Sequence, residues 1–174
     1  MSGSFVIEAL QGTHDRRGFV SGVDALDRYF REQVTQDIRR RLTNCFVAVD
    51  AAGGVVGFYT FAATSLPMTD LGPEEIKRLP RYPLLPAGLI GRLAVAGAAR
   101  GQGLGSALLV DALSRALRSE PAIFALLVDA KDEAAKRFYL HHGFRALVSR
   151  PQSLFLPVAG AAQALQAART DREE

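Results

Sequence analysis

The chain has 174 residues, of which 48% are hydrophobic and 22% charged, and its formal net charge is +3 at pH 7. This length and apolar content predict one globular domain and exclude a disordered chain. The longest strand-like apolar run, residues 122–128, is too short to cross a bilayer, and no basic secretory signal opens the sequence. A single cysteine, Cys45, cannot form an internal disulfide, so we expect a cytoplasmic protein with no membrane contact.

Hydrophobic periodicity predicts the elements of the first half of the chain. In order, we expect a strand, an amphipathic helix, and two strands joined by a turn at Gly53-Gly54: residues 4–10, 22–42, 44–50 and 53–63. A proline-rich loop with a short helix starting at Pro73 then leads into a fourth strand: residues 64–87 and 87–97.

The second half alternates helices and strands. We expect a helix whose apolar face carries Leu104, Leu108, Leu109, Leu113 and Leu117, then a buried strand, a helix stopped by Gly143, and two closing strands: residues 103–118, 122–130, 132–142, 144–149 and 152–158. The order β-α-β-β-loop-β-α-β-α-β-β predicts an α/β domain with a mixed sheet and parallel pairing at its centre. We assign this domain to residues 1–157 and regard residues 158–174 as a C-terminal tail, either a terminal helix or a frayed end.

A glycine-rich loop, "RGQGLG" at residues 100–105, joins the fourth strand to the following helix. Glycines at a helix start let backbone N–H groups approach an anion, and Arg100 adds a positive charge, so the pattern favours phosphate binding. A dinucleotide-binding fingerprint would need glycine where Ser106 stands, and too little chain follows Asp129 for the rest of such a sheet. An ordinary tight turn between strand and helix is the other alternative.

The stretch "ARGQGLGSALL" resembles the R-x-x-G-x-G/A signature of the GNAT family of N-acetyltransferases, and the order of elements resembles that fold over residues 5–157. The resemblance implies acetyl-CoA as co-substrate. Its pyrophosphate would lie on the amides of residues 101–106, and its pantetheine arm would pair with the strand at residues 93–95. The acetyl-CoA residues implied are Leu93, Ala94, Val95, Arg100, Gly101, Gln102, Gly103, Leu104, Gly105, Ser106, Asp132 and Phe138.

A narrower resemblance is to the toxin branch of that family, which acetylates aminoacyl-tRNA. It is carried by "GRLAV", "RGQGLGSALLVDAL", "FYLHHGF" and "SLFLP", with further agreement in "GVDALDRYFREQ" and "VVGFYTFA". The resemblance implies a homodimer and a ribbon-helix-helix antitoxin encoded alongside, with DNA contacted only through the antitoxin. Ala96-Gly97 departs from the pattern, because many relatives have an acidic residue there.

The chemistry of acetyl transfer needs a neutral amine, and the strand at residues 87–97 carries no carboxylate to act as its base. An α-amino group has a pKa near 8, so roughly a quarter is already neutral at pH 7.5, whereas lysine is almost fully protonated. A base could still come from Asp129 or Asp132. The resemblance places the Tyr139 hydroxyl beside the CoA sulfur as general acid, the alternative being that Tyr139 and Phe138 only pack together.

Basic residues cluster in two regions that flank the acceptor side in this fold, where they could grip an RNA backbone. We assign tRNA contacts to Arg28, Arg31, Arg39, Arg40, Arg41, Lys77, Arg78, Arg81 and Arg92, the alternative being a solvated charged face. We expect no metal, because neighbouring His141 and His142 on a helix point about 100° apart. Cys45 is predicted to be buried and inert, and His14 lies in a loop without a signal.

These patterns together predict a toxin that acetylates the α-amino group of an aminoacyl-tRNA and so blocks translation. An ordinary acetyltransferase acting on a small amine or a protein N-terminus is the alternative enzyme. A binding module with a decayed enzyme fold is the alternative from another class, although the glycine loop and Tyr139 are both present. The sequence does not indicate which tRNA or amino acid is modified.

Overall fold

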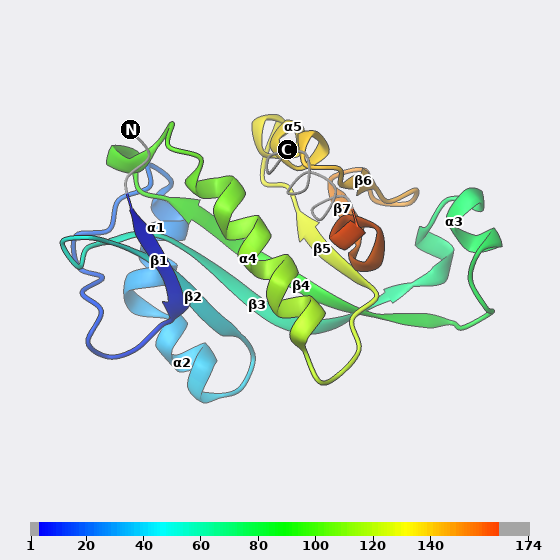
Figure 1. Cartoon of the computed structure of the whole chain (residues 1–174), viewed down its shortest axis with the longest axis horizontal. Helices are drawn as coiled ribbons and strands as arrows, with labels where there is room; N and C mark the ends of the chain where they lie inside the picture. The colour runs from blue at the N-terminus through cyan, green and yellow to red at the C-terminus, as the bar shows by residue number, and fades with distance from the viewer. Residues whose placement is uncertain (1–3, 164–174) are drawn as a thin grey trace, which may run out of the picture. The chain divides into compact units, whose positions relative to one another are not determined.

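Seven strands form one sheet in the order β1-β2-β3-β4-β5-β7-β6 in the computed structural model, which describes residues 4–163 (Figure 1). The chain divides into two compact units, formed by residues up to 62 with 90–112, and by residues 63–89 with 113 onward. Two strands and one helix, β3, β4 and α4, contribute residues to both units. The predicted mixed α/β class is confirmed.

The predicted order of elements is confirmed, except that two helices stand where one was predicted between the first two strands. The strands are β1 (Phe5–Ala9), β2 (Asn44–Asp50), β3 (Val55–Pro67), β4 (Leu84–Val95), β5 (Ala125–Asp129), β6 (Arg145–Ala146) and β7 (Ser153–Pro157). The helices are α1 (Asp24–Glu32), α2 (Val34–Arg39), α3 (Pro73–Lys77), α4 (Leu104–Arg118) and α5 (Glu133–His141), with short 3-10 turns η1 (Met68–Asp70) and η2 (Gly97–Ala99). Residues 158–163 of the predicted tail are helical, and residues 164–174 lie outside the described residues.

The prediction of one continuous helix over residues 22–42 is wrong. The chain breaks at Gln33, where φ is −121° and ψ is −30°, and α1 and α2 are separate helices. In a straight helix, residues eight apart are separated by about 12 Å along the axis. The break brings the Tyr29 hydroxyl to 2.8 Å from the Asp37 carboxylate, to which it donates a hydrogen bond.

The predicted proline-rich loop is shorter than expected at both ends. The strand β3 continues to Pro67 and β4 begins at Leu84, because prolines fit at strand ends and edges even though they interrupt the sequence pattern. A hydrogen bond of 3.2 Å from the Met68 amide to the Pro83 carbonyl ties the two ends of the remaining loop. The short helix predicted from Pro73 is confirmed as α3.

Within the first unit, the sheet is covered on both faces. On one face, Phe30 of α1 stacks on Phe58 of β3 with ring centroids 4.2 Å apart, and Phe19 meets both rings edge-on. On the other face, a Cβ at Gly57 would lie 3.2 Å from side-chain carbons of both Leu104 and Leu108. The absence of a side chain at Gly57 therefore lets the start of α4 lie directly on the strand.

Within the second unit, β5 and β7 pair antiparallel, and β6 pairs antiparallel with β7, as predicted for two closing strands. Buried residues of this unit's core include Leu66, Leu85, Leu127 and Phe155. The apolar face predicted for α4 is confirmed except at Leu117, which is exposed, while Ala116 is buried instead. Successive residues turn by about 100°, which carries Leu117 out of the buried stripe.

Among the described residues, no helix is long and apolar enough to span a membrane. Nor do the described residues bring together three or more His, Cys, Asp or Glu side chains that could hold a metal ion.

Cys45 provides a test of packing in the first unit. Its side chain is buried, as predicted, and burial raises the pKa of the thiol to about 12. Because the thiolate is the reactive form, we expect no reaction with a disulfide reagent such as DTNB in the native state, and one equivalent after unfolding in guanidinium. Stoichiometric labelling of the native protein within minutes would contradict this packing.

Candidate active site

The glycine loop lies between η2 and α4, where the sequence predicts it. Gly101 and Gly103 have φ values of +80° and +73°, although a Cβ at either position would meet nothing within 4 Å. Backbone conformation, rather than space, therefore explains these two glycines, since other residues are strained at positive φ. The amide of Ala107 donates to the Gly103 carbonyl as the first hydrogen bond of α4.

This geometry suits an anion. The first N–H groups of a helix have no acceptor within the helix, and the helix dipole places partial positive charge there. Gly101, Gln102 and Gly103 are exposed, so a ligand can reach the loop backbone directly. The start of this 15-residue helix therefore suits a phosphate or pyrophosphate.

Arg100 is anchored as well as charged. Its guanidinium donates a hydrogen bond to the carbonyl of Ser21, a residue that precedes α1. The side chain remains exposed, so its other N–H donors are available to a ligand. Arg100 therefore connects the loop to a segment nearly eighty residues earlier in the chain.

The predicted pantetheine-contacting residues, Leu93, Ala94 and Val95, end β4 immediately before η2 and the glycine loop. Ala94 is buried and its two neighbours are half-buried. The amide of Ala96 donates to the Val56 carbonyl at 2.8 Å, which fixes the chain as it leaves the strand. The end of β4 and the glycine loop thus follow one another in the first unit.

Arg92 is packed where the sequence predicts a free RNA-binding cation. Its guanidinium lies 3.5 Å from the centroid of the Tyr29 ring, in a cation–π contact. Burial is the main reason that the pKa of Tyr29 is raised, with the hydrogen bond to Asp37 acting in the same direction. Arg92, Tyr29 and Asp37 therefore form a chain of contacts linking β4, α1 and α2.

Tyr139 lies on α5 in the second unit. The residue is only 8% exposed, and its ring packs against Phe138 and Phe144 with centroids 5.3 and 5.4 Å away. Desolvation raises the pKa of Tyr139 to about 12. Among the described residues, no group hydrogen-bonds its hydroxyl. The raised pKa keeps the phenol protonated at neutral pH.

The other candidates on α5 and before it make structural contacts. Asp132 is the N-cap of α5 and accepts a 2.8 Å hydrogen bond from the Ala135 amide. Asp129 accepts a 2.5 Å hydrogen bond from the Ser153 hydroxyl. Phe138 packs between Tyr139 and His142, with centroids 5.3 and 4.6 Å away. Asp132 therefore caps α5, Asp129 is bonded to β7, and Phe138 packs on its neighbouring rings.

The adjacent histidines do not form a ligand pair. A ring nitrogen of His142 lies 2.8 Å from the Phe138 carbonyl at the end of α5, and the two histidine rings are inclined by 79°. This agrees with the predicted role at the helix end. His14, which the sequence left without a role, lies 2.7 Å from the Glu8 carboxylate and accepts a hydrogen bond from the Gln11 amide.

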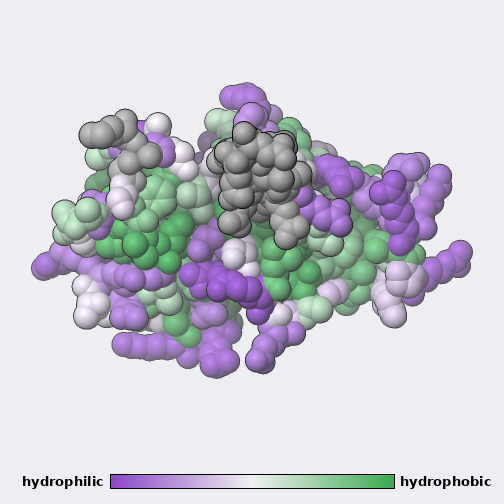
Figure 2. All heavy atoms as spheres, in the orientation of Figure 1, coloured by the Kyte–Doolittle hydropathy of each residue, from purple (hydrophilic) through white to green (hydrophobic). Residues whose placement is uncertain are grey.

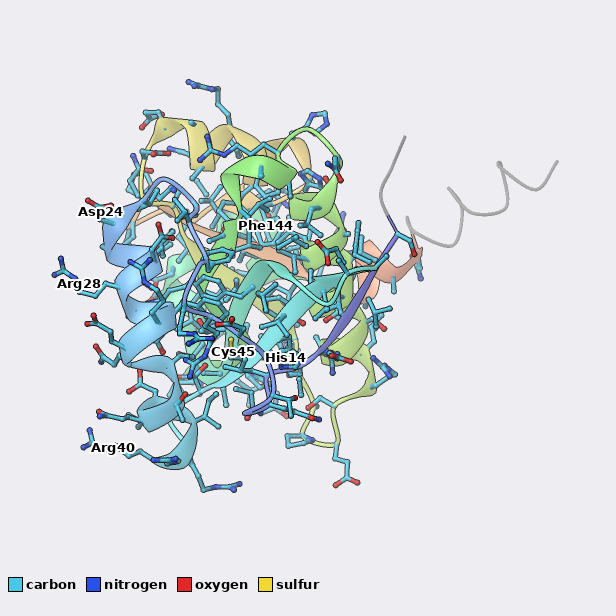
Figure 3. All side chains as sticks on the ribbon, turned by 90° about the vertical axis from the view of Figure 1, so that its left-hand side faces the viewer. His14, Asp24, Arg28, Arg40, Cys45 and Phe144 are labelled. Carbon is cyan, nitrogen blue, oxygen red and sulfur yellow. The ribbon has the colours of Figure 1, made fainter. Side chains whose placement is uncertain are left out.

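The first basic cluster lies along α1, α2 and the turn after α2. Its members are exposed, and Arg28 and Arg40 project away from the two helices (Figure 3). Arg31 donates to the Phe19 carbonyl at 3.3 Å, whereas the other four have no hydrogen bond or ion pair within the described residues: Arg28, Arg39, Arg40 and Arg41. They are available to an anionic partner.

The second basic cluster lies on and after α3, where the surface is hydrophilic (Figure 2). Lys77 pairs with Glu74 at 3.4 Å, while Arg78 and Arg81 are exposed and unpaired within the part of the chain described. The nearby Glu75 and Asp70 are neutralised by Arg145 and Arg150, at 2.6 and 3.4 Å, and both pairs lie within the second unit.

The sequence prediction missed Tyr82, which lies beside Arg81 and is 59% exposed. Its amide donates to the Pro80 carbonyl at 3.0 Å, so the backbone that presents the ring is held in a turn. The sequence signal that could have indicated this residue is an aromatic side chain between two prolines and next to an arginine. Two buried residues before and on α1, Ser21 and Asp27, were also missed, because no sequence motif marks them.

Comparisons with known proteins agree with this geometry. The Acetyltransferase (GNAT) domain matches residues 41–146, more than half of the chain. A tRNA-acetylating toxin of Mycobacterium tuberculosis is 35% identical over 90% of this chain and 93% of its own length. AtaT complexed with acetyl-methionyl-tRNAfMet has a TM-score of 0.83 and 26% identity, covering 93% of this chain and 99% of its own. AtaTR bound with AcCoA has a TM-score of 0.78 and 25% identity, covering 95% and 99%. The glycine loop, the strand before it and the near-complete alignment place this chain in the GNAT family of acetyltransferases.

Proposed function

We propose that this chain is a toxin that transfers the acetyl group of acetyl-CoA to the α-amino group of an aminoacyl-tRNA. The amino acid then cannot serve as the acceptor in peptide-bond formation, and translation stops. One observation carries the proposal: the 35% identity to a tRNA-acetylating toxin extends over 90% of this chain, through both the glycine loop and Tyr139.

Two groups of residues would perform the transfer. The amides of Gly101 to Ser106 and the free donors of Arg100 would hold the pyrophosphate of acetyl-CoA, and Leu93 to Val95 would pair with its pantetheine arm. The free α-amine attacks the thioester carbonyl, and the tetrahedral intermediate collapses with loss of the CoA thiolate. The Tyr139 hydroxyl would donate a hydrogen bond, and then a proton, to that sulfur.

We propose that the RNA is held mainly through its phosphates by the two basic clusters. Tyr82, exposed beside Arg78 and Arg81, would stack on an unpaired base near the acceptor end of the tRNA. Arg92, stacked on Tyr29, would contribute through the position of β4 and α1 rather than as a mobile cation.

We also propose that the protein acts in the cytoplasm as a homodimer and is inhibited by a cognate antitoxin of the ribbon-helix-helix kind. Through that antitoxin it would reach DNA indirectly. The similarity to toxins supports this set of partners. Co-expression with the neighbouring gene, followed by copurification and sedimentation analysis, tests both the partner and the dimer.

The first prediction tests the reaction. Purified protein incubated with acetyl-CoA and an aminoacylated tRNA pool should place acetyl on the α-amine of one or a few amino acids, detected by mass analysis after deacylation. Tyr139→Phe should lower kcat by about 100-fold or more, because it removes the proton donor while keeping the ring packing. Its affinity for acetyl-CoA should stay within about twofold.

Unmodified tRNA in the presence of bound acetyl-CoA would contradict the substrate class and favour an enzyme acting on small amines or protein N-termini. A Tyr139→Phe variant with full activity would contradict the general-acid role alone.

The second prediction concerns ionisation of Tyr139. Burial favours the neutral phenol and raises its folded-state pKa to about 12, above the value of about 10 in an unfolded chain. The contribution of the buried, neutral Tyr139 to the stability of the folded protein is therefore complete below pH 10 and is lost as the pH rises from about 10 to 12. The difference in tyrosinate absorbance between the native protein and Tyr139→Phe should be absent at pH 10.5; a full tyrosinate signal there would contradict the burial of the ring.

The third prediction tests the RNA surface on the second unit. Arg78→Ala with Arg81→Ala should weaken tRNA binding and lower the slope of log K against log salt by about 1 to 2, since each lost phosphate contact removes nearly one unit. Tyr82→Ala should weaken binding by about tenfold with the salt slope unchanged, while Tyr82→Phe retains affinity.

Arg118→Ala is the matched control, because it removes an exposed arginine of the same unit that lies outside both basic clusters. An equal loss of affinity in Arg118→Ala, or a full loss in Tyr82→Phe, would show that the surface has been assigned wrongly.

A further inference from the structure

The segment before α1 holds the turn that precedes the glycine loop at both of its ends. The Gly97 amide, at the start of η2, donates a 2.9 Å hydrogen bond to the Val20 carbonyl. The Arg100 guanidinium, at the end of η2, donates to the Ser21 carbonyl. Two consecutive carbonyls therefore fix the first residue of η2 and the first residue of the loop.

The buried carboxylate of Asp27 in turn fixes Ser21. Asp27 is 3% exposed, and its Oδ1 accepts hydrogen bonds from the Ser21 amide at 3.0 Å and from the Ser21 hydroxyl at 2.6 Å. Its Oδ2 lies 3.1 Å from the same amide. No cation pairs with Asp27 among the described residues, so the donors of Ser21 satisfy this carboxylate. Burying a carboxylate in this way is costly unless its hydrogen bonds are made.

Gly22 completes the arrangement. Its φ is +97°, and a Cβ there would lie 3.0 Å from the terminal nitrogen of Arg100. Any other residue would be strained in its backbone and would crowd the guanidinium. The segment is therefore shaped to let the Arg100 side chain reach the Ser21 carbonyl.

We infer that Asp27 and Ser21 are positioning residues for acetyl-CoA binding, acting through Arg100 on the glycine loop. They contact no substrate. A loop with glycines at 101, 103 and 105 has few side chains with which to fix itself, so its geometry depends on contacts from elsewhere. With one donor anchored on Ser21, Arg100 keeps its remaining donors oriented toward a pyrophosphate and loses less freedom on binding.

The test measures binding of CoA by titration calorimetry, without any acceptor, so that it holds whether or not the proposed tRNA substrate is correct. Asp27→Asn disturbs the bonds of the carboxylate to Ser21, and Ser21→Ala removes only the hydroxyl. We expect CoA affinity to fall about tenfold in Asp27→Asn and about threefold in Ser21→Ala, because both substitutions weaken the binding of CoA itself. Asp24→Asn is the matched control, since it makes the same charge change in the same turn of α1 and should bind as the native protein does.

A double-mutant cycle with Arg100→Gln separates positioning from a general structural role. If Asp27 acts through Arg100, then Asp27→Asn should cause little further loss of CoA affinity in the Arg100→Gln background. Equal losses in both backgrounds would overturn the inference, as would native affinity in Asp27→Asn. If Asp27→Asn does not fold, the same cycle with Ser21→Ala decides between the two outcomes.

The acetyl-transfer assay adds a second readout. Loss of pyrophosphate binding raises KM for acetyl-CoA and leaves kcat within about twofold. S-acetyl-pantetheine lacks the pyrophosphate, so its kcat/KM should be the same in the native protein, Ser21→Ala and Asp27→Asn. A parallel loss with S-acetyl-pantetheine would show that the substitutions damage the site in general.

Discussion

The conformation of the glycine loop depends on the left-handed backbone at Gly101 and Gly103. These two residues turn the chain from η2 into α4. These two positions contribute no side chains to packing. The hydrogen bonds from Gly97 and Arg100 to the segment before α1 supply the missing restraint. The six-residue glycine loop is thus held by a segment nearly eighty residues earlier in the chain.

The same logic explains why α1 and α2 are two helices. The bend at Gln33 lets the Tyr29 hydroxyl meet Asp37, and the face of the same ring carries the Arg92 guanidinium. The anchor of β4 is therefore built from both helices, while the exposed arginines of these helices remain free for a partner. Residues that position the strand and the exposed arginines proposed to bind RNA therefore lie on the same two helices.

Local signals in the sequence predicted much of the fold. The apolar spacing of α4, the turn at Gly53-Gly54 and the stop at Gly143 all depend on neighbours within a few residues. The errors occurred where distant contacts decide the structure: the bend at Gln33, the strand that extends to Pro67 and the strand that contains Pro86. The glycine loop was predictable because the spacing of its glycines is a local feature of the sequence. The roles of Ser21 and Asp27 were not, since only the folded chain brings them to Arg100.

The chemistry of the proposed acceptor also accounts for what the site lacks. No carboxylate occurs in β4, and one oxygen of each alternative base, Asp129 and Asp132, already accepts a structural hydrogen bond. A lysine acceptor would need a strong base, since its ammonium group has a pKa near 10.4. An α-amine is about two units less basic and supplies its own neutral fraction near pH 7.5. The proposed reaction then requires only that both substrates bind and that the departing sulfur is protonated, and the protonated phenol of Tyr139 is the proposed donor.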